Sequence, residues 1–221
     1  MPKRTESSPN ATRQKLLEAG VELFRARGYG GTTIDDICKA AGVTKGGFFH
    51  YFASKDEVAN AALAEFGEAR RELFREAPFR KLDDPLDRLF ARLDFEKSLI
   101  ASSGKMKGCL AGMLAQELAL NRDEFQVACR DYFERAAEDW MTDLAAAKAA
   151  YAPQAGFDPR GVALFYLGIS QGSQILAKSF GSNEVRLANI EQFRTYLSCL
   201  FRVGSADRAG QKHKAAISID A

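Results

Sequence analysis

Apolar residues recur every three to four positions along most of this chain, which is the spacing of an amphipathic α-helix. Leu17, Val21 and Phe24 form one such face, and no stretch alternates with the period of two that a strand requires. We therefore expect an all-α fold. Capping residues, glycines and prolines divide the pattern into about nine predicted helices, namely 11–27, 33–41, 44–52, 54–76, 84–102, 108–120, 122–150, 159–180 and 184–202.

The two ends of the chain are polar and show no helical period. They predict a flexible basic arm over residues 1–10, with Lys3 and Arg4, and a disordered tail over 204–221. Between them we expect a small helical domain over 11–53 and a larger helical domain over 54–203.

Composition narrows the classes of protein. The 221 residues are 46% hydrophobic and 27% charged, enough for a sizeable core, and the net charge is only +2. No apolar run reaches the length of a membrane span, so we expect a cytoplasmic protein without membrane contact. The chain has four cysteines without a CxxC pair and only two histidines, too few to favour a metal site or a catalytic triad. We expect no cofactor.

Two short predicted helices, 33–41 and 44–52, meet at a tight turn formed by Gly42 and Val43. Thr44 stands where its hydroxyl would cap the start of the second helix. A short helix, a glycine turn and a second capped helix form the pattern of a helix-turn-helix unit.

The second of these helices has two different faces. Phe48 and Phe52 lie four residues apart and point with Val43 toward the core. The opposite face consists of Lys45, Gly46, Phe49 and His50. Glycines disfavour a helix but leave its backbone open to close approach, and a helix N-terminus suits phosphate.

Local charge supports a nucleic-acid interface. No acidic residue occurs between Ile37 and Lys55, whereas Lys39 and Lys45 lie within that stretch. The alternatives are a plain three-helix core unit, an all-helical enzyme, or a helical adaptor that binds no DNA. No GxSxG, HExxH or P-loop motif supports an enzyme.

The segment "TTIDDICKAAGVTKGGFFHYFASKDEV" resembles the DNA-binding segment of TetR-family transcriptional regulators. The resemblance covers about residues 12–60. It implies a three-helix DNA-binding head with a helix-turn-helix, joined to a helical body that binds a ligand and forms a homodimer. The implied function is repression at a pseudo-palindromic double-stranded DNA operator, relieved by a small-molecule or reactive-electrophile inducer.

The resemblance also implies roles for individual residues. It implies phosphate contacts for Thr33, Tyr51 and Lys55. The groove would be faced by Thr44, Lys45, Gly46 and His50, and Gly47 would allow backbone approach. Phe49 departs from the family pattern, where tyrosine is common, and two contacts stay open for it: a thymine methyl group or a sugar.

The predicted body has two candidate surfaces. Small and aromatic residues of the last two helices predict a dimer interface at Gly168, Gly172, Phe193, Leu197 and Phe201. Ligand contacts are expected among Phe66, Phe95, Cys109, Met113, Gln116, Glu117, Tyr132, Gln174 and Lys178.

One further resemblance concerns "KGCLAGMLAQEL" and "QGSQILAKS". These segments are similar to a TetR subgroup that senses reactive electrophiles, and the similarity implies a reactive thiol at Cys109 with Lys178 near it. A thiol in the first turn of a helix near Lys105 and Lys107 gains thiolate character. The alternative is that Cys109 is a small buried apolar residue, as Cys38 is expected to be.

Overall fold

The computed structural model describes residues 9–102 and 108–202, which form nine α-helices and one 3-10 helix without a strand. Their bounds are α1 Pro9–Arg27, α2 Ile34–Ala41, α3 Lys45–Tyr51, α4 Lys55–Arg75, η1 Pro78–Lys81, α5 Pro85–Ser102, α6 Leu110–Leu118, α7 Asp123–Tyr151, α8 Pro159–Phe180 and α9 Glu184–Leu200. The predicted all-α fold is confirmed. The sequence pattern missed only η1 among these elements.

Some predicted features lie outside the described residues. These are the tail over 204–221, most of the arm over 1–10, and the two lysines Lys105 and Lys107. None of the described helices is long and apolar enough to cross a membrane.

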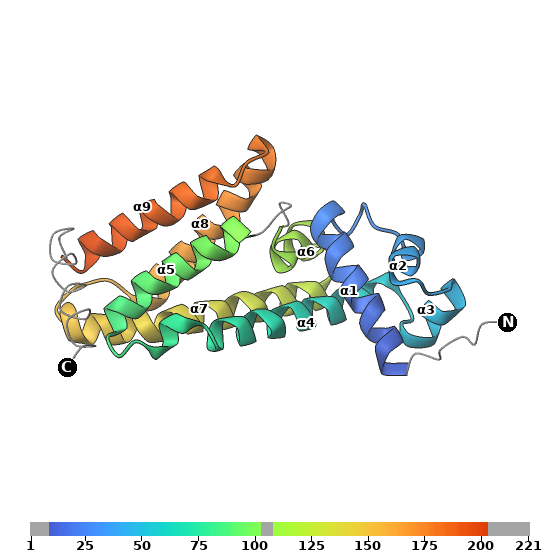
Figure 1. Cartoon of the computed structure of the whole chain (residues 1–221), viewed down its shortest axis with the longest axis horizontal. Coiled ribbons are helices and arrows are strands. Elements are labelled where there is room, and N and C mark those ends of the chain that lie inside the picture. The colour runs from blue at the N-terminus through green and yellow to red at the C-terminus, as the bar shows by residue number, and fades with distance from the viewer. Residues whose placement is uncertain (1–8, 103–107, 203–221) are drawn as a thin grey trace, which may run out of the picture. The chain divides into compact units, whose positions relative to one another are not determined.

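The described residues divide into two compact units. Unit 1 comes from residues 1–77 and 105–136, and unit 2 from 78–104 and 137–221. This division differs from the boundary after residue 53 that the sequence predicts. The reason is packing: α6 and the first part of α7 lie against α1 and α4, so they share one core with the helix-turn-helix (Figure 1).

Local signals explain the helix-turn-helix of unit 1. Thr33 is the N-cap of α2 and forms a complete capping box with Asp36. Gly42 ends α2 in the left-handed conformation, at φ 67°, which costs glycine little. Thr44 then caps α3 by accepting a hydrogen bond from the Gly47 amide at 3.1 Å. The predicted turn at Gly42 and the predicted cap at Thr44 are confirmed.

Unit 2 has a separate aromatic core. Trp140 of α7, Tyr166 of α8 and Phe193 of α9 pack together, with the Trp140 and Tyr166 ring centroids 4.3 Å apart. Helix α9 packs against both α5 and α8 (Figure 1). Asp158 caps α8 ahead of Pro159.

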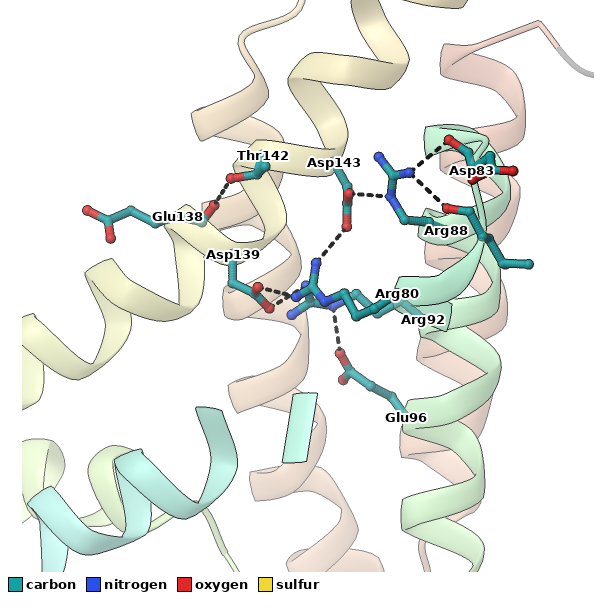
Figure 2. A network of polar contacts seen from close by, with 10 residues as sticks. Arg80, Asp83, Arg88, Arg92, Glu96, Glu138, Asp139, Thr142 and Asp143 are labelled. Atoms are coloured by element: carbon teal, nitrogen blue, oxygen red, sulfur yellow. Dashed lines mark hydrogen bonds and ion pairs between the residues drawn. The ribbon is translucent and has the colours of Figure 1, made fainter. Parts of the chain in front are cut away.

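A network of charges links η1, α5 and α7 in unit 2 (Figure 2). Asp143 of α7 is only 2% exposed and accepts hydrogen bonds from two arginines. Arg80 Nη1 lies 3.1 Å and Arg88 Nε 2.8 Å from its two oxygens. A carboxylate with this little exposure needs such partners, so the network fixes η1 and α5 onto α7.

Arg92 of α5 extends the same network. Its guanidinium donates to Asp139 at 2.7 Å, lies 3.4 Å from Glu96 and covers the Trp140 ring at 4.1 Å. Glu96 also accepts a hydrogen bond from the Tyr166 hydroxyl at 2.7 Å. These paired charges belong to the core of unit 2.

Candidate nucleic-acid interface

One side of α3 is exposed along its whole length. We call it the outer face; it consists of Thr44, Lys45, Gly46, Phe49 and His50. On the opposite side Phe48 and Phe52 are 0% and 2% exposed and pack with Val43 in the core of unit 1. The predicted division of this helix into two faces is therefore confirmed.

The two glycines of α3, Gly46 and Gly47, have different surroundings. A Cβ on Gly47 would lie 2.8 Å from Val43 Cγ1, so this position must stay bare for the turn to pack. A Cβ on Gly46 would meet nothing within 4 Å. The predicted approach of another molecule to the backbone therefore concerns Gly46, and internal packing accounts for Gly47.

Lys45 has a partner that the sequence pattern did not indicate. Its Nζ lies 3.0 Å from Asp35 Oδ1 of α2, and both side chains are more than half exposed. Exposed ion pairs contribute little to stability, so Lys45 is free to exchange this carboxylate for another acceptor. Asp35 holds the ammonium group over the outer face in the absence of such an acceptor.

The aromatic rings of α3 are held edge to face. Phe49 is 50% exposed, and its ring meets the buried Phe48 ring at 81° with centroids 5.3 Å apart. The exposed His50 ring meets Tyr51 in the same manner at 4.8 Å. Phe49 therefore presents an apolar ring to solvent on a helix that otherwise exposes polar side chains and backbone.

Two predicted phosphate contacts have internal partners. The Thr33 hydroxyl donates to Asp36 at 2.6 Å within the capping box. Lys55 Nζ donates to the Tyr29 and Thr32 carbonyls at 3.0 and 2.9 Å and lies 3.9 Å from the Tyr29 ring centroid. Burial lowers the pKa of Lys55. The structure thus gives Lys55 a role in holding the turn between α1 and α2.

Tyr29 is the hub of that turn, and the sequence pattern did not single it out. It is 9% exposed, and its hydroxyl contacts Asp56 of α4 and Arg122 next to α7. Arg122 in turn binds Asp56 at 2.5 Å. Burial, together with the hydrogen bond to Asp56, raises the pKa of Tyr29. The glycines on both sides of Tyr29 are the one sequence signal that indicates an unusual turn here.

Glu117 of α6 reaches the same turn. Its carboxylate oxygens accept hydrogen bonds from the backbone amides of Tyr29 at 2.9 Å and Gly30 at 2.7 Å. The sequence predicts a ligand contact for Glu117, which stays a prediction; in the structure both of its oxygens bind this turn.

Three of the predicted ligand residues come together in unit 1. Cys109 Sγ lies 3.8 Å from the Tyr132 hydroxyl, and the Tyr132 ring stacks on Phe66 at 6.0 Å. Arg25 of α1 lies over the Phe66 ring, 5.0 Å from its centroid. Burial raises the pKa of Tyr132, so its hydroxyl stays protonated beside the thiol.

The remaining predicted ligand residues have other partners or lie in unit 2. The side-chain amides of Gln116 and Gln174 donate to carbonyls of their own helices, Gly112 at 2.9 Å and Ser170 at 3.3 Å. Met113 of α6 is half-buried. The other members belong to unit 2, where Phe95 pairs with Phe79 and Lys178 is exposed on α8. The predicted proximity of Lys178 to Cys109 stays a prediction.

The predicted dimer residues divide into two groups. Phe193, Leu197 and Phe201 are 1%, 0% and 4% exposed, so they belong to the core of unit 2 and do not line a surface. Gly168 and Gly172 have nothing within 4 Å of a Cβ position. Around these glycines α8 exposes Leu164, Phe165, Ile175, Leu176 and Phe180.

A capped pair of short helices with an exposed, basic and glycine-bearing second helix defines a helix-turn-helix protein. Residues 16–62 match the family described as bacterial regulatory proteins, tetR family. The match covers the helix-turn-helix and the start of α4. Similar proteins include transcriptional regulators and a transcriptional repressor.

Similar proteins extend the likeness beyond the helix-turn-helix. The transcriptional regulator AcuR from Cereibacter sphaeroides is 33% identical over 127 residues, which are 57% of this chain and 58% of AcuR. The chain thus spans somewhat more than half the length of this relative. A crystal structure of a regulatory protein TetR from Rhodobacter sphaeroides is 28% identical, with a TM-score of 0.74 over 86% of this chain and 98% of that one.

A third likeness concerns fold alone. The reduced form of NemR from Escherichia coli is 23% identical, with a TM-score of 0.69 over 83% of this chain and 95% of that one.

Proposed function

We propose that this protein is a cytoplasmic, DNA-binding transcriptional repressor that an inducer releases from its operator. The observation that carries the proposal is the outer face of α3. It combines an ammonium group at Lys45, a bare backbone at Gly46, an imidazole at His50 and an apolar ring at Phe49 on one exposed helix.

Each part of the outer face suits a different feature of the major groove. Lys45 matches the acceptor atoms of guanine, and His50 can donate to a base or a phosphate. Phe49 suits the methyl group of thymine. Gly46 lets the backbone at the start of α3 approach the duplex, where amide groups favour phosphate. Thr33, Tyr51 and Lys55 would contact the flanking phosphates.

The proposed repressor acts as a homodimer through α8. The exposed apolar side chains of this helix surround two glycines that leave the backbone open, which is how helices approach each other closely. Two copies would place two α3 helices on the two halves of a pseudo-palindromic operator.

We place the inducer-sensing group at Cys109. The thiol is half-buried, adjoins the Tyr132 hydroxyl and sits at the start of α6, next to Gly108, whose carbonyl accepts a hydrogen bond from Arg25 of α1 at 2.8 Å. A bulky adduct on this sulfur would press on the contact between α6 and α1. Burial raises the pKa of Cys38, and raises that of Cys129 to about 11, so these two thiols are poor nucleophiles.

Binding of DNA is tested with a fluorescent duplex enriched from a random pool by the wild-type protein. Lys45→Ala should weaken binding by about tenfold and relax the preferred sequence, as loss of a base contact does. Lys81→Ala removes the same charge from an exposed position in unit 2 and should change nothing. Equal binding by wild type and Lys45→Ala would contradict the assignment of α3.

Sensing is tested on the same complex with p-benzoquinone as the electrophile. The wild-type complex should dissociate as Cys109 becomes alkylated, which mass spectrometry detects. Cys109→Ser should bind the duplex normally and resist release. Release of the Cys109→Ser complex at the wild-type quinone concentration would rule out this site and leave the DNA-binding proposal standing.

A further inference from the structure

The turn after α1 is built around a carboxylate from a distant part of the chain. Glu117, in the last turn of α6, spans the Tyr29 and Gly30 amides with its two oxygens, at 2.9 and 2.7 Å. These amides come directly after the end of α1, where backbone N–H groups have no helical partner of their own. Such charge-assisted hydrogen bonds are about twice as strong as neutral ones.

The backbone of the turn is shaped to receive this carboxylate. Gly28 adopts φ +81°, and a Cβ there would lie 2.5 Å from Glu117 Oε1. Only glycine satisfies both the left-handed conformation and the close approach. Successive amides that follow a left-handed residue form a concave anion site, and Glu117 occupies it.

The other side of the turn is fixed by α4. Lys55 Nζ binds the Tyr29 and Thr32 carbonyls, while the buried Thr32 hydroxyl donates to the Gly28 carbonyl at 2.8 Å. Glu117 thus holds the amides of the turn and Lys55 holds its carbonyls. The turn leads directly into Thr33, the N-cap of α2, so its conformation sets where the helix-turn-helix begins.

Helix α6 is joined to α1 at its other end as well. Arg25 Nε donates to the Gly108 carbonyl at 2.8 Å, and the Gly108 amide lies 3.4 Å from the Arg25 carbonyl. Eight residues separate Cys109 from Glu117, about 12 Å along a helix at 1.5 Å per residue.

We propose that Glu117 is a positioning residue that keeps the helix-turn-helix in the geometry that reads DNA. This inference rests on the proposed function. The contacts are sensitive to small shifts: moving α6 by about 1 Å lengthens both bonds beyond the range of a hydrogen bond. Without Glu117 the turn keeps the support of Lys55 alone, and the start of α2 at Thr33 loses one of the contacts that fix its position.

Amide exchange tests the contact without DNA. Glu117→Ala should raise the exchange rates of the Tyr29 and Gly30 amides by roughly tenfold in NMR spectra of the full chain, as loss of a charge-assisted hydrogen bond predicts. Glu124→Ala removes a carboxylate from an exposed position of α7 in the same unit and should leave both rates unchanged. Unchanged rates in Glu117→Ala would contradict the proposal.

Binding tests the consequence for reading DNA. Affinities are measured for the enriched duplex and for a scrambled duplex of equal length. Glu117→Ala and the isosteric Glu117→Gln should lower the ratio of these affinities by about tenfold, because base contacts need the fixed placement of α3 whereas phosphate contacts carry no sequence information. A residue that served only overall stability would lower the melting temperature without changing the ratio.

The outcomes separate the two proposals. A wild-type protein with no preference for the enriched duplex over the scrambled one contradicts the proposed function. A wild-type protein with that preference, and Glu117 variants that retain it in full, contradict the positioning role alone.

Discussion

Gly46→Ala should separate folding from DNA binding. Alanine is favoured over glycine inside a helix by about 0.5–1 kcal/mol, and the new methyl group would meet no atom of the protein within 4 Å. The variant should therefore unfold at a higher urea concentration than wild type. Its affinity for the enriched duplex should nevertheless fall by about tenfold, or ~1.4 kcal/mol, because the methyl group occupies the space that the duplex must enter.

Gly47→Ala is the matched control, one residue further along the same helix. Its Cβ would lie 2.8 Å from Val43 Cγ1, and such overpacking costs about 1–3 kcal/mol of folding free energy. Urea unfolding followed by circular dichroism gives both stabilities, and fluorescence anisotropy gives both affinities. The reasoning is refuted if Gly46→Ala binds the enriched duplex as tightly as wild type.

Three further predictions follow from unit 2 and the cysteines. Arg92→Ala should destabilise the protein by about 3–5 kcal/mol in urea unfolding, since it strands a buried carboxylate, whereas exposed Arg75→Ala should cost less than ~0.5 kcal/mol. Iodoacetamide at pH 8 should modify exposed Cys199 well before Cys129, whose pKa of about 11 keeps it a thiol there; equal rates in peptide mass spectra would contradict this. Gly168→Arg should leave the fold intact but shift sedimentation from dimer to monomer, and an unchanged dimer would exclude this face.

Much of the fold could be predicted because its helices are specified locally. The caps Thr33, Thr44 and Asp158 and the stop at Gly42 each lie within a few residues of the backbone groups that they satisfy. The 3-10 helix η1 escaped prediction because four residues are too few to show a period. The two faces of α3 also follow from spacing alone, since an apolar pair four residues apart must point inward together.

The pairings between distant residues could not be predicted. Glu117 and Tyr29 lie 88 positions apart, and the sequence around either residue does not indicate that the other is its partner. Gly46 and Gly47 look alike in the sequence, yet only a neighbouring side chain distinguishes them. A repeat of aromatic residues such as Phe193 and Phe201 shows that one helix face is apolar but does not show which partner covers it.

The central claim is that the outer face of α3 reads a DNA sequence. Its most direct test is selection from a random duplex pool by the wild-type protein and by a variant carrying Lys45→Ala and His50→Ala. The account predicts that wild type enriches a motif with two-fold symmetry and that the variant loses the preference at the positions those side chains contact. Enrichment of the same motif by both proteins, or of no motif by wild type, would contradict it.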